Sequence, residues 1–81
     1  MDKNILLSNI DKLHTTKMGI ERIKKNLNID IDDVVDYCKN KILDKNCYIY
    51  KYGKNWYCEI DHVKITVNSY NYTIITAHVV R

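Results

Sequence analysis

The strongest constraint on the fold is a change in hydrophobic spacing close to Asn46. Before that residue, apolar side chains recur every three or four positions, as they do along a helix that buries one side. After it, as in Val63-Lys64-Ile65-Thr66-Val67, apolar and polar residues alternate as they do in a strand. The sequence therefore predicts one α+β domain, helical over residues 1–45 and stranded over residues 46–81.

Three helices are predicted in the first half. The first runs from about Lys3 to Leu13 with Asp2 as its cap, and the second from about Lys17 to Leu27 with Thr15 or Thr16 as its cap. The third has Asp30, in an acidic stretch of the chain, as its cap and ends near Leu43. Gly19 predicts a close approach of backbone or side chain, because glycine inside a helix costs about 1 kcal/mol relative to alanine.

Two tight turns define how the strands pair. One lies at Gly53-Lys54 and the other at Asp61-His62. They set these residues opposite one another: Tyr48 and Glu59, Ile49 and Cys58, Tyr50 and Tyr57, Glu59 and Lys64, Cys58 and Ile65. The predicted fold is a four-stranded antiparallel meander with the three helices packed on one face.

Alternation divides the sheet into two faces. The inner face is expected to hold Cys47, Ile49, Trp56, Cys58, Ile60, Val63, Ile65, Val67, Ile75, Ala77 and Val79. The outer face is expected to hold Tyr48, Tyr50, Tyr52, Tyr57, Glu59, Lys64, Thr66, Thr76 and His78. In the last strand Ile74 and Val80 fall on the outer side, and a slip of one residue would turn His78 inward.

Composition excludes several classes of protein. Hydrophobic residues make up 46% and charged residues 28%, with no proline, which is typical of a folded chain. No apolar run spans a bilayer and Met1-Asp2 begins no secretory signal, so we expect a cytoplasmic protein without a membrane partner. The three cysteines lack disulfide or zinc-ligand spacing and are expected to be buried thiols, and no metal or cofactor is expected. A net charge of +3 permits a polyanionic partner without indicating a dense basic patch.

Several stretches resemble a small bacterial domain of unknown function, and together they cover nearly the whole chain. They are Leu13-His14-Thr15-Thr16, Gly19, Arg22-Ile23, Lys25-Asn26-Leu27, Gly53-Lys54-Asn55-Trp56-Tyr57, Ile65-Thr66-Val67-Asn68 and Tyr72-Thr73-Ile74-Ile75-Thr76-Ala77-His78. This resemblance implies a bacterial or phage origin but no activity.

The expected architecture is also similar to the barnase and RelE group of small ribonucleases, many of which are toxins. The similarity implies that RNA lies on the open sheet face, where metal-free cleavage needs a base, an acid and a cation. The candidates are Glu59 or His14 as base, His78 as acid with Thr76 on the same face, Lys64, Arg22 or Lys54 as cation, and Tyr50 and Tyr57 as stacking partners for unpaired bases.

Each candidate also has a structural explanation. Glu59 and Lys64 form a cross-strand ion pair, His14 belongs to a helix end, and Arg22 reaches a nearby aspartate, while the others are ordinary strand residues. Two functions therefore fit. The first is RNA-directed, metal-independent ribonuclease-like activity, as in a toxin with an antitoxin partner. The alternative is a non-catalytic protein-binding module or inhibitor of mobile-element or phage origin, whose partner is its target protein.

Overall fold

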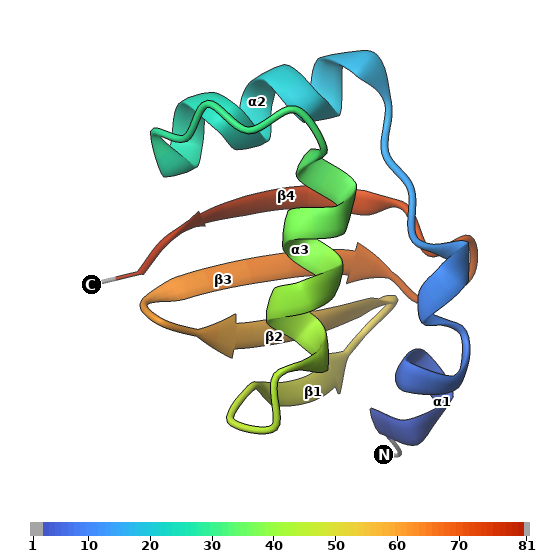
Figure 1. Cartoon of the computed structure of the whole chain (residues 1–81). Coiled ribbons are helices and arrows are strands. Elements are labelled where there is room, and N and C mark those ends of the chain that lie inside the picture. Colours follow the sequence, from blue (N-terminus) through green and yellow to red (C-terminus); the bar gives the residue numbers. More distant parts are fainter. Residues whose placement is uncertain (1–2, 81) are drawn as a thin grey trace.

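The computed structural model describes residues 3–80 (Figure 1). Its elements follow in chain order: α1 (Lys3–Ser8), the short 3-10 helix η1 (Ile10–Lys12), α2 (Lys17–Leu27), α3 (Val34–Leu43), β1 (Tyr48–Tyr52), β2 (Asn55–Ile60), β3 (Val63–Asn68) and β4 (Ile74–Val79). The strands form one antiparallel sheet in the order β1-β2-β3-β4. The predicted α+β class, with helices before strands, is confirmed.

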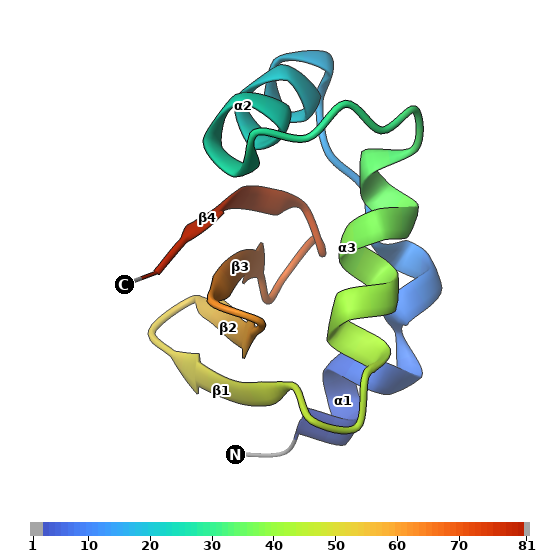
Figure 2. The same cartoon turned by 60° about the vertical axis from the view of Figure 1, so that its left-hand side comes forward.

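The sequence predicts all three helices over one sheet face, but the structure does not place all of them there. Figure 2 shows α3 crossing one face with α1 near its lower end, whereas α2 lies along the outer edge of β4. The chain before α2 is bonded to that edge: Ile74 N–H donates to the His14 carbonyl at 2.7 Å, and the Thr15 hydroxyl donates to the Ile74 carbonyl at 2.9 Å. These bonds place the start of α2 beside β4, where the helix shields an edge strand.

Both ends of α2 agree with the prediction. The Thr16 hydroxyl caps the helix by accepting the Gly19 N–H at 3.0 Å, and Asn28 ends it in the left-handed conformation. A side chain at position 19 would collide with the Thr15 hydroxyl. The close approach predicted for Gly19 is thus confirmed.

The other two helices are shorter than predicted. The amide of Asn9 donates to the Ile5 carbonyl at 2.8 Å and so occupies an acceptor that a longer α1 would use; η1 follows. Asp2, the predicted cap, lies outside the described residues. α3 begins later than expected because Asp33, and not Asp30, caps it by accepting the Asp36 N–H at 2.9 Å.

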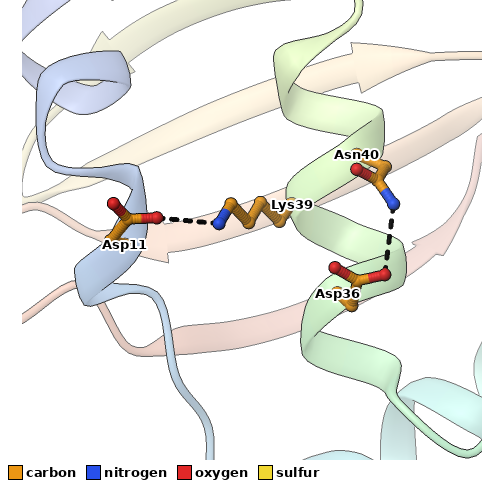
Figure 3. Close-up of polar contacts among 4 residues, drawn as sticks. All are labelled: Asp11, Asp36, Lys39 and Asn40. Carbon is orange, nitrogen blue, oxygen red and sulfur yellow. Dashed lines mark hydrogen bonds and ion pairs between the residues drawn. The ribbon is translucent and has the colours of Figure 1, made fainter.

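An ion pair joins the amino-terminal segment to α3 (Figure 3). Lys39 Nζ lies 2.7 Å from Asp11 Oδ1, so this contact bridges η1 and α3. The lysine lowers the pKa of Asp11, and the aspartate raises the pKa of Lys39. On the neighbouring turn, the Asn40 amide donates to Asp36 at 3.2 Å.

The predicted pairing of the first three strands is confirmed at every position. β1 and β2 pair with Tyr50 opposite Tyr57, and β2 and β3 pair with Glu59 opposite Lys64. Both connections are two-residue turns. Gly53 has φ +62°, and Asp61 and His62 have φ +53° and +64°, as turns that match the twist of the strands require.

The prediction for β4 is wrong at two apolar positions. A β-bulge sets Ile74 opposite Val67 and Thr76 opposite Thr66, so Ile75 is an extra residue between them. Ile74, predicted on the outer face, is only 1% exposed, whereas Ile75 is 38% exposed. Val79 pairs with the buried Val63 and so lies on the inner face, as predicted, although it is 49% exposed at the end of this edge strand.

The core lies between α3, α2, the amino-terminal segment and the inner sheet face. Its buried residues are Leu6, Ile10, Leu13, Ile23, Leu27, Val34, Cys38, Ile42, Cys47, Trp56, Cys58, Val63, Ile65, Val67, Ile74 and Ala77. The three cysteines are buried free thiols, as predicted. Burial raises the pKa of Cys38 to about 12, while a hydrogen bond with Cys47, together with burial, raises the pKa of Cys58.

Candidate functional site

The sheet face opposite α3 is covered by no helix of residues 3–80 (Figure 2). Side chains directly opposite one another on paired strands share a face, and the pairing continues across all four strands. One row consists of Tyr48, Glu59, Lys64 and His78, and the next consists of Tyr50, Tyr57, Thr66 and Thr76. His78, Thr76 and Lys64 therefore lie on one face, as the alternation predicts.

The first row brings together a carboxylate, an ammonium group and an imidazole, which we call the Glu-Lys-His row: Glu59, Lys64 and His78. Lys64 Nζ lies 3.8 Å from Glu59 Oε2, so the predicted cross-strand contact is present. His78 is exposed on β4, beside Lys64 on the central strand β3. The row sets Lys64 between the two other groups, which are two strand spacings, or about 10 Å, apart.

Two tyrosines of the second row contact Glu59 and Lys64. The Tyr50 hydroxyl donates to Glu59 Oε2 at 2.8 Å, and this bond raises the pKa of Tyr50. The rings of Tyr50 and Tyr57 stack with centroids 5.4 Å apart, while Lys64 Nζ lies 5.7 Å from the centre of the Tyr57 ring. The side chains of Glu59 and Lys64 are thus fixed by contacts but remain 37% and 28% exposed.

His14 lies elsewhere. Its backbone pairs with Thr73, five residues before His78 and hence roughly 16 Å away along the strand. Its ring contacts the Lys12 carbonyl at 2.8 Å and the Thr73 hydroxyl at 3.0 Å. These bonds hold the segment before α2 against the start of β4, so the structure gives His14 a local bridging role.

Of the two alternative cations, Lys54 lies away from the Glu-Lys-His row, whereas Arg22 belongs to α2, which packs beside β4. Lys54 belongs to the β1–β2 turn at the opposite end of the sheet, where its carbonyl accepts the Ser69 N–H at 2.8 Å. Arg22 is exposed on α2. Thr76, in contrast, is next to the row and accepts a hydrogen bond from the Asn26 amide of α2 at 3.3 Å.

The structure adds a feature that sequence reasoning missed. A hollow of about 440 Å³ lies where the β2–β3 hairpin extends past the first residue of β1. This hairpin hollow is lined by Tyr48, Glu59, Ile60, His62, Val63 and Val80. The sequence predicts Tyr48 opposite Glu59, but for His62 it predicts only a place in the turn. Its carbonyl accepts the Val80 N–H at 2.7 Å, a contact between segments that no local pattern reveals.

A second, smaller hollow of about 200 Å³ lies between η1 and α3. Its acidic residues already have partners: Asp11 binds Lys39, Asp33 caps α3 and Asp36 binds Asn40. No group of three His, Cys, Asp or Glu side chains within residues 3–80 is arranged to hold a metal ion. In the same range, no helix is long and apolar enough to cross a membrane.

The fold and the site define a class: a small α+β domain in which helices precede a four-stranded antiparallel meander that leaves one polar, tyrosine-rich face open. The chain belongs to the family described as Protein of unknown function (DUF3781), which matches residues 7–78. The resemblance to a domain of unknown function is thereby confirmed. No curated protein and no solved structure shows significant similarity to the chain.

Proposed function

We propose that this domain is a metal-independent ribonuclease whose active site is the Glu-Lys-His row. The observation that carries the proposal is the order of the three groups, with Lys64 on the strand between Glu59 and His78. A phosphate held over Lys64 has a base on one side and an acid on the other. An in-line displacement at phosphorus needs this arrangement, because the attacking and leaving oxygens occupy opposite sides.

The reaction follows from these positions. Glu59 takes the proton of the ribose 2′-hydroxyl, whose oxygen attacks the adjacent phosphorus. His78, in its protonated form, gives a proton to the departing 5′-oxygen, and Lys64 offsets the negative charge that grows on the phosphate. The products are a 2′,3′-cyclic phosphate and a free 5′-hydroxyl. Glu59 is the base in this scheme because His14 lies at the other end of the sheet.

Tyr50 is a positioning residue in this scheme. Its hydroxyl and the Lys64 ammonium both contact Glu59 Oε2, at 2.8 and 3.8 Å. In this scheme the other carboxylate oxygen, Oε1, accepts the substrate proton.

The test is cleavage of single-stranded RNA by purified protein in the presence of a chelator. We expect His78→Ala and Glu59→Gln each to reduce the rate by about 10²–10⁴-fold, the usual contribution of a general acid or base. Lys54→Met is the matched control for Lys64→Met, because both remove an exposed or half-exposed lysine from the sheet region but only Lys64 is in the row. Circular dichroism verifies that each variant is folded.

Two results would reject the proposal. One is the absence of cleavage by the wild-type protein over a broad panel of RNAs. The other is cleavage by His78→Ala and Glu59→Gln at the wild-type rate, because the row would then contribute nothing.

A second function is favoured by the tyrosines of β1. Tyr48 and Tyr52 are 66% and 76% exposed and lie with Tyr50 on the open face of an edge strand. Exposed tyrosines at a free sheet edge suit docking of another protein. Tight capture of a protein partner by a wild-type domain that cleaves no RNA would favour this non-catalytic role.

A further inference from the structure

The hairpin hollow lies directly beside the Glu-Lys-His row, because Glu59 belongs to both. We infer that this hollow binds an unpaired nucleobase of the RNA substrate, in the nucleotide next to the phosphate held by the row. The inference rests on the proposed function and adds its substrate class, single-stranded RNA, and a binding site for one base.

The lining suits a flat heterocycle. Ile60, Val63 and Val80 provide apolar surface, and Tyr48 and His62 provide two rings. The volume of about 440 Å³ falls within the range typical of small-ligand sites. Unpaired bases bind proteins mainly by stacking on aromatic side chains and by hydrogen bonds to their edges, and this lining offers both.

Charge decides which part of a nucleotide enters. Glu59 is one of the lining residues, and its negative charge close to the hollow disfavours a phosphate there. Lys64 and His78 lie on the next two strands, away from β1. The uncharged base therefore occupies the hollow and the phosphate lies over β3, so the bound strand crosses β2 between them.

The base must be unpaired. The Tyr48 ring is held against Tyr50, with centroids 5.3 Å apart and planes tilted by 39°, yet its residue is 66% exposed. A base within a duplex is already stacked on both faces and paired at its edge. It cannot reach such a ring without leaving the helix, which costs free energy that a single strand does not lose.

His62 supports the site through its backbone. It lies in the left-handed conformation of the β2–β3 turn, and its carbonyl is held by Val80 N–H at 2.7 Å. The turn therefore keeps its position relative to the end of β4, and the hollow is formed before a ligand binds.

Binding can be separated from cleavage by using short single strands of 2′-O-methyl RNA, in which the attacking hydroxyl is blocked. We expect amide chemical shifts to change at Tyr48, Glu59, His62, Val63 and Val80. Tyr48→Ala should weaken binding by about 5- to 150-fold, the loss of one stacked base, while Tyr48→Phe retains it. Tyr52→Ala is the matched control, since Tyr52 is an exposed tyrosine of the same strand and face at its other end.

The outcomes distinguish the two proposals. Cleavage by wild type with equal binding by Tyr48→Ala, or a blocked duplex bound as tightly as a single strand, would overturn the base site and leave the ribonuclease. Binding that requires Tyr48 without cleavage of unmodified RNA would support the hollow as a nucleotide site and reject the ribonuclease.

Discussion

At the scale of single residues, Glu59 makes the contacts that hold the polar side chains of the open face together. It is the only carboxylate of the two rows, and it contacts both Tyr50 and Lys64 through the same oxygen. Each contact alone is worth little at a partly exposed position. Together they fix the carboxylate in one orientation, which matters more for chemistry than for stability.

The hydrogen bond between Tyr50 and Glu59 predicts a titration change. Because the carboxylate raises the pKa of Tyr50, Glu59→Gln should lower that pKa toward its ordinary value of 10.0. The stabilising effect of this bond is present below that value and is lost as pH rises through the higher folded pKa. Ultraviolet absorbance titration measures the change. Glu21→Gln, on exposed α2, should leave the curve unchanged; identical curves for both variants would contradict the contact.

At the scale of elements, β4 resolves a conflict between two requirements. Its start must bury Ile74 against Val67, and its end must keep Thr76 and His78 on the open face. Strict alternation would put all three on one side. The extra residue at Ile75 shifts the register, so both requirements are met.

Because of this bulge, we expect alanine substitutions at the two neighbouring isoleucines to lower the stability by unequal amounts. Ile74→Ala should lower the free energy of unfolding by about 2–5 kcal/mol, because it leaves a cavity at a residue that is 1% exposed. Ile75→Ala should cost less than about 1 kcal/mol, since Ile75 is 38% exposed. Chemical denaturation of both variants measures the difference. A larger loss for Ile75→Ala would show that the strand has the unbulged register.

The ion pair between Asp11 of η1 and Lys39 of α3 predicts that the stability of the folded protein depends on pH. Asp11 has a lowered pKa in the folded protein because Lys39 hydrogen-bonds to it and attracts its charge. A carboxyl group whose pKa is lowered by folding stabilises the protein at pH values above its unfolded pKa. This stabilisation is lost as the pH falls through the folded pKa. Asp11→Asn should therefore be less stable than wild type at neutral pH, and the difference should shrink as the pH falls below 3.8 and vanish below the lowered folded pKa.

Melting temperatures across pH test this link. Asp32→Asn, in the exposed segment before α3, is the matched control and should show no such difference. A destabilisation of Asp11→Asn that persists in acid would mean that the ion pair is not its cause. Added salt should reduce the neutral-pH difference, because both side chains reach solvent.

At the scale of the whole molecule, one sheet face builds the core and the other remains open. The buried thiols report on the integrity of that core: burial raises the pKa of Cys38 to about 12, and Cys58 has its pKa raised by hydrogen bonding to Cys47 and by burial. A thiol must be exposed and ionised to react. We expect both to be alkylated only when the domain unfolds.

The alkylation rate should therefore follow stability across variants. It should rise for Ile74→Ala and remain near the wild-type value for Ile75→Ala, as followed by mass spectrometry. Fast alkylation of Cys38 in the stable wild-type protein would show that α3 opens separately from the sheet.

The sequence by itself determined the order of elements, the bounds of α2, and the pairing of β1, β2 and β3. Each depends on residues close in the chain: the period of apolar side chains, the cap at Thr16, and the turns at Gly53-Lys54 and Asp61-His62. From that pairing, the neighbourhood of Glu59 and Lys64 followed, and alternation put His78 on the same face.

Only the tertiary structure decided the rest. Asp33, and not another of the nearby aspartates, caps α3. The chain turns across residues 28–33 so that α2 and α3 reach different parts of the sheet, and this turn sets where α3 begins. The tertiary structure placed α2 along β4 and His14 away from the Glu-Lys-His row through bonds between residues 14–15 and 72–74. It also formed the bulge and the hairpin hollow. These features depend on contacts between segments far apart in the chain, for which local spacing carries no information.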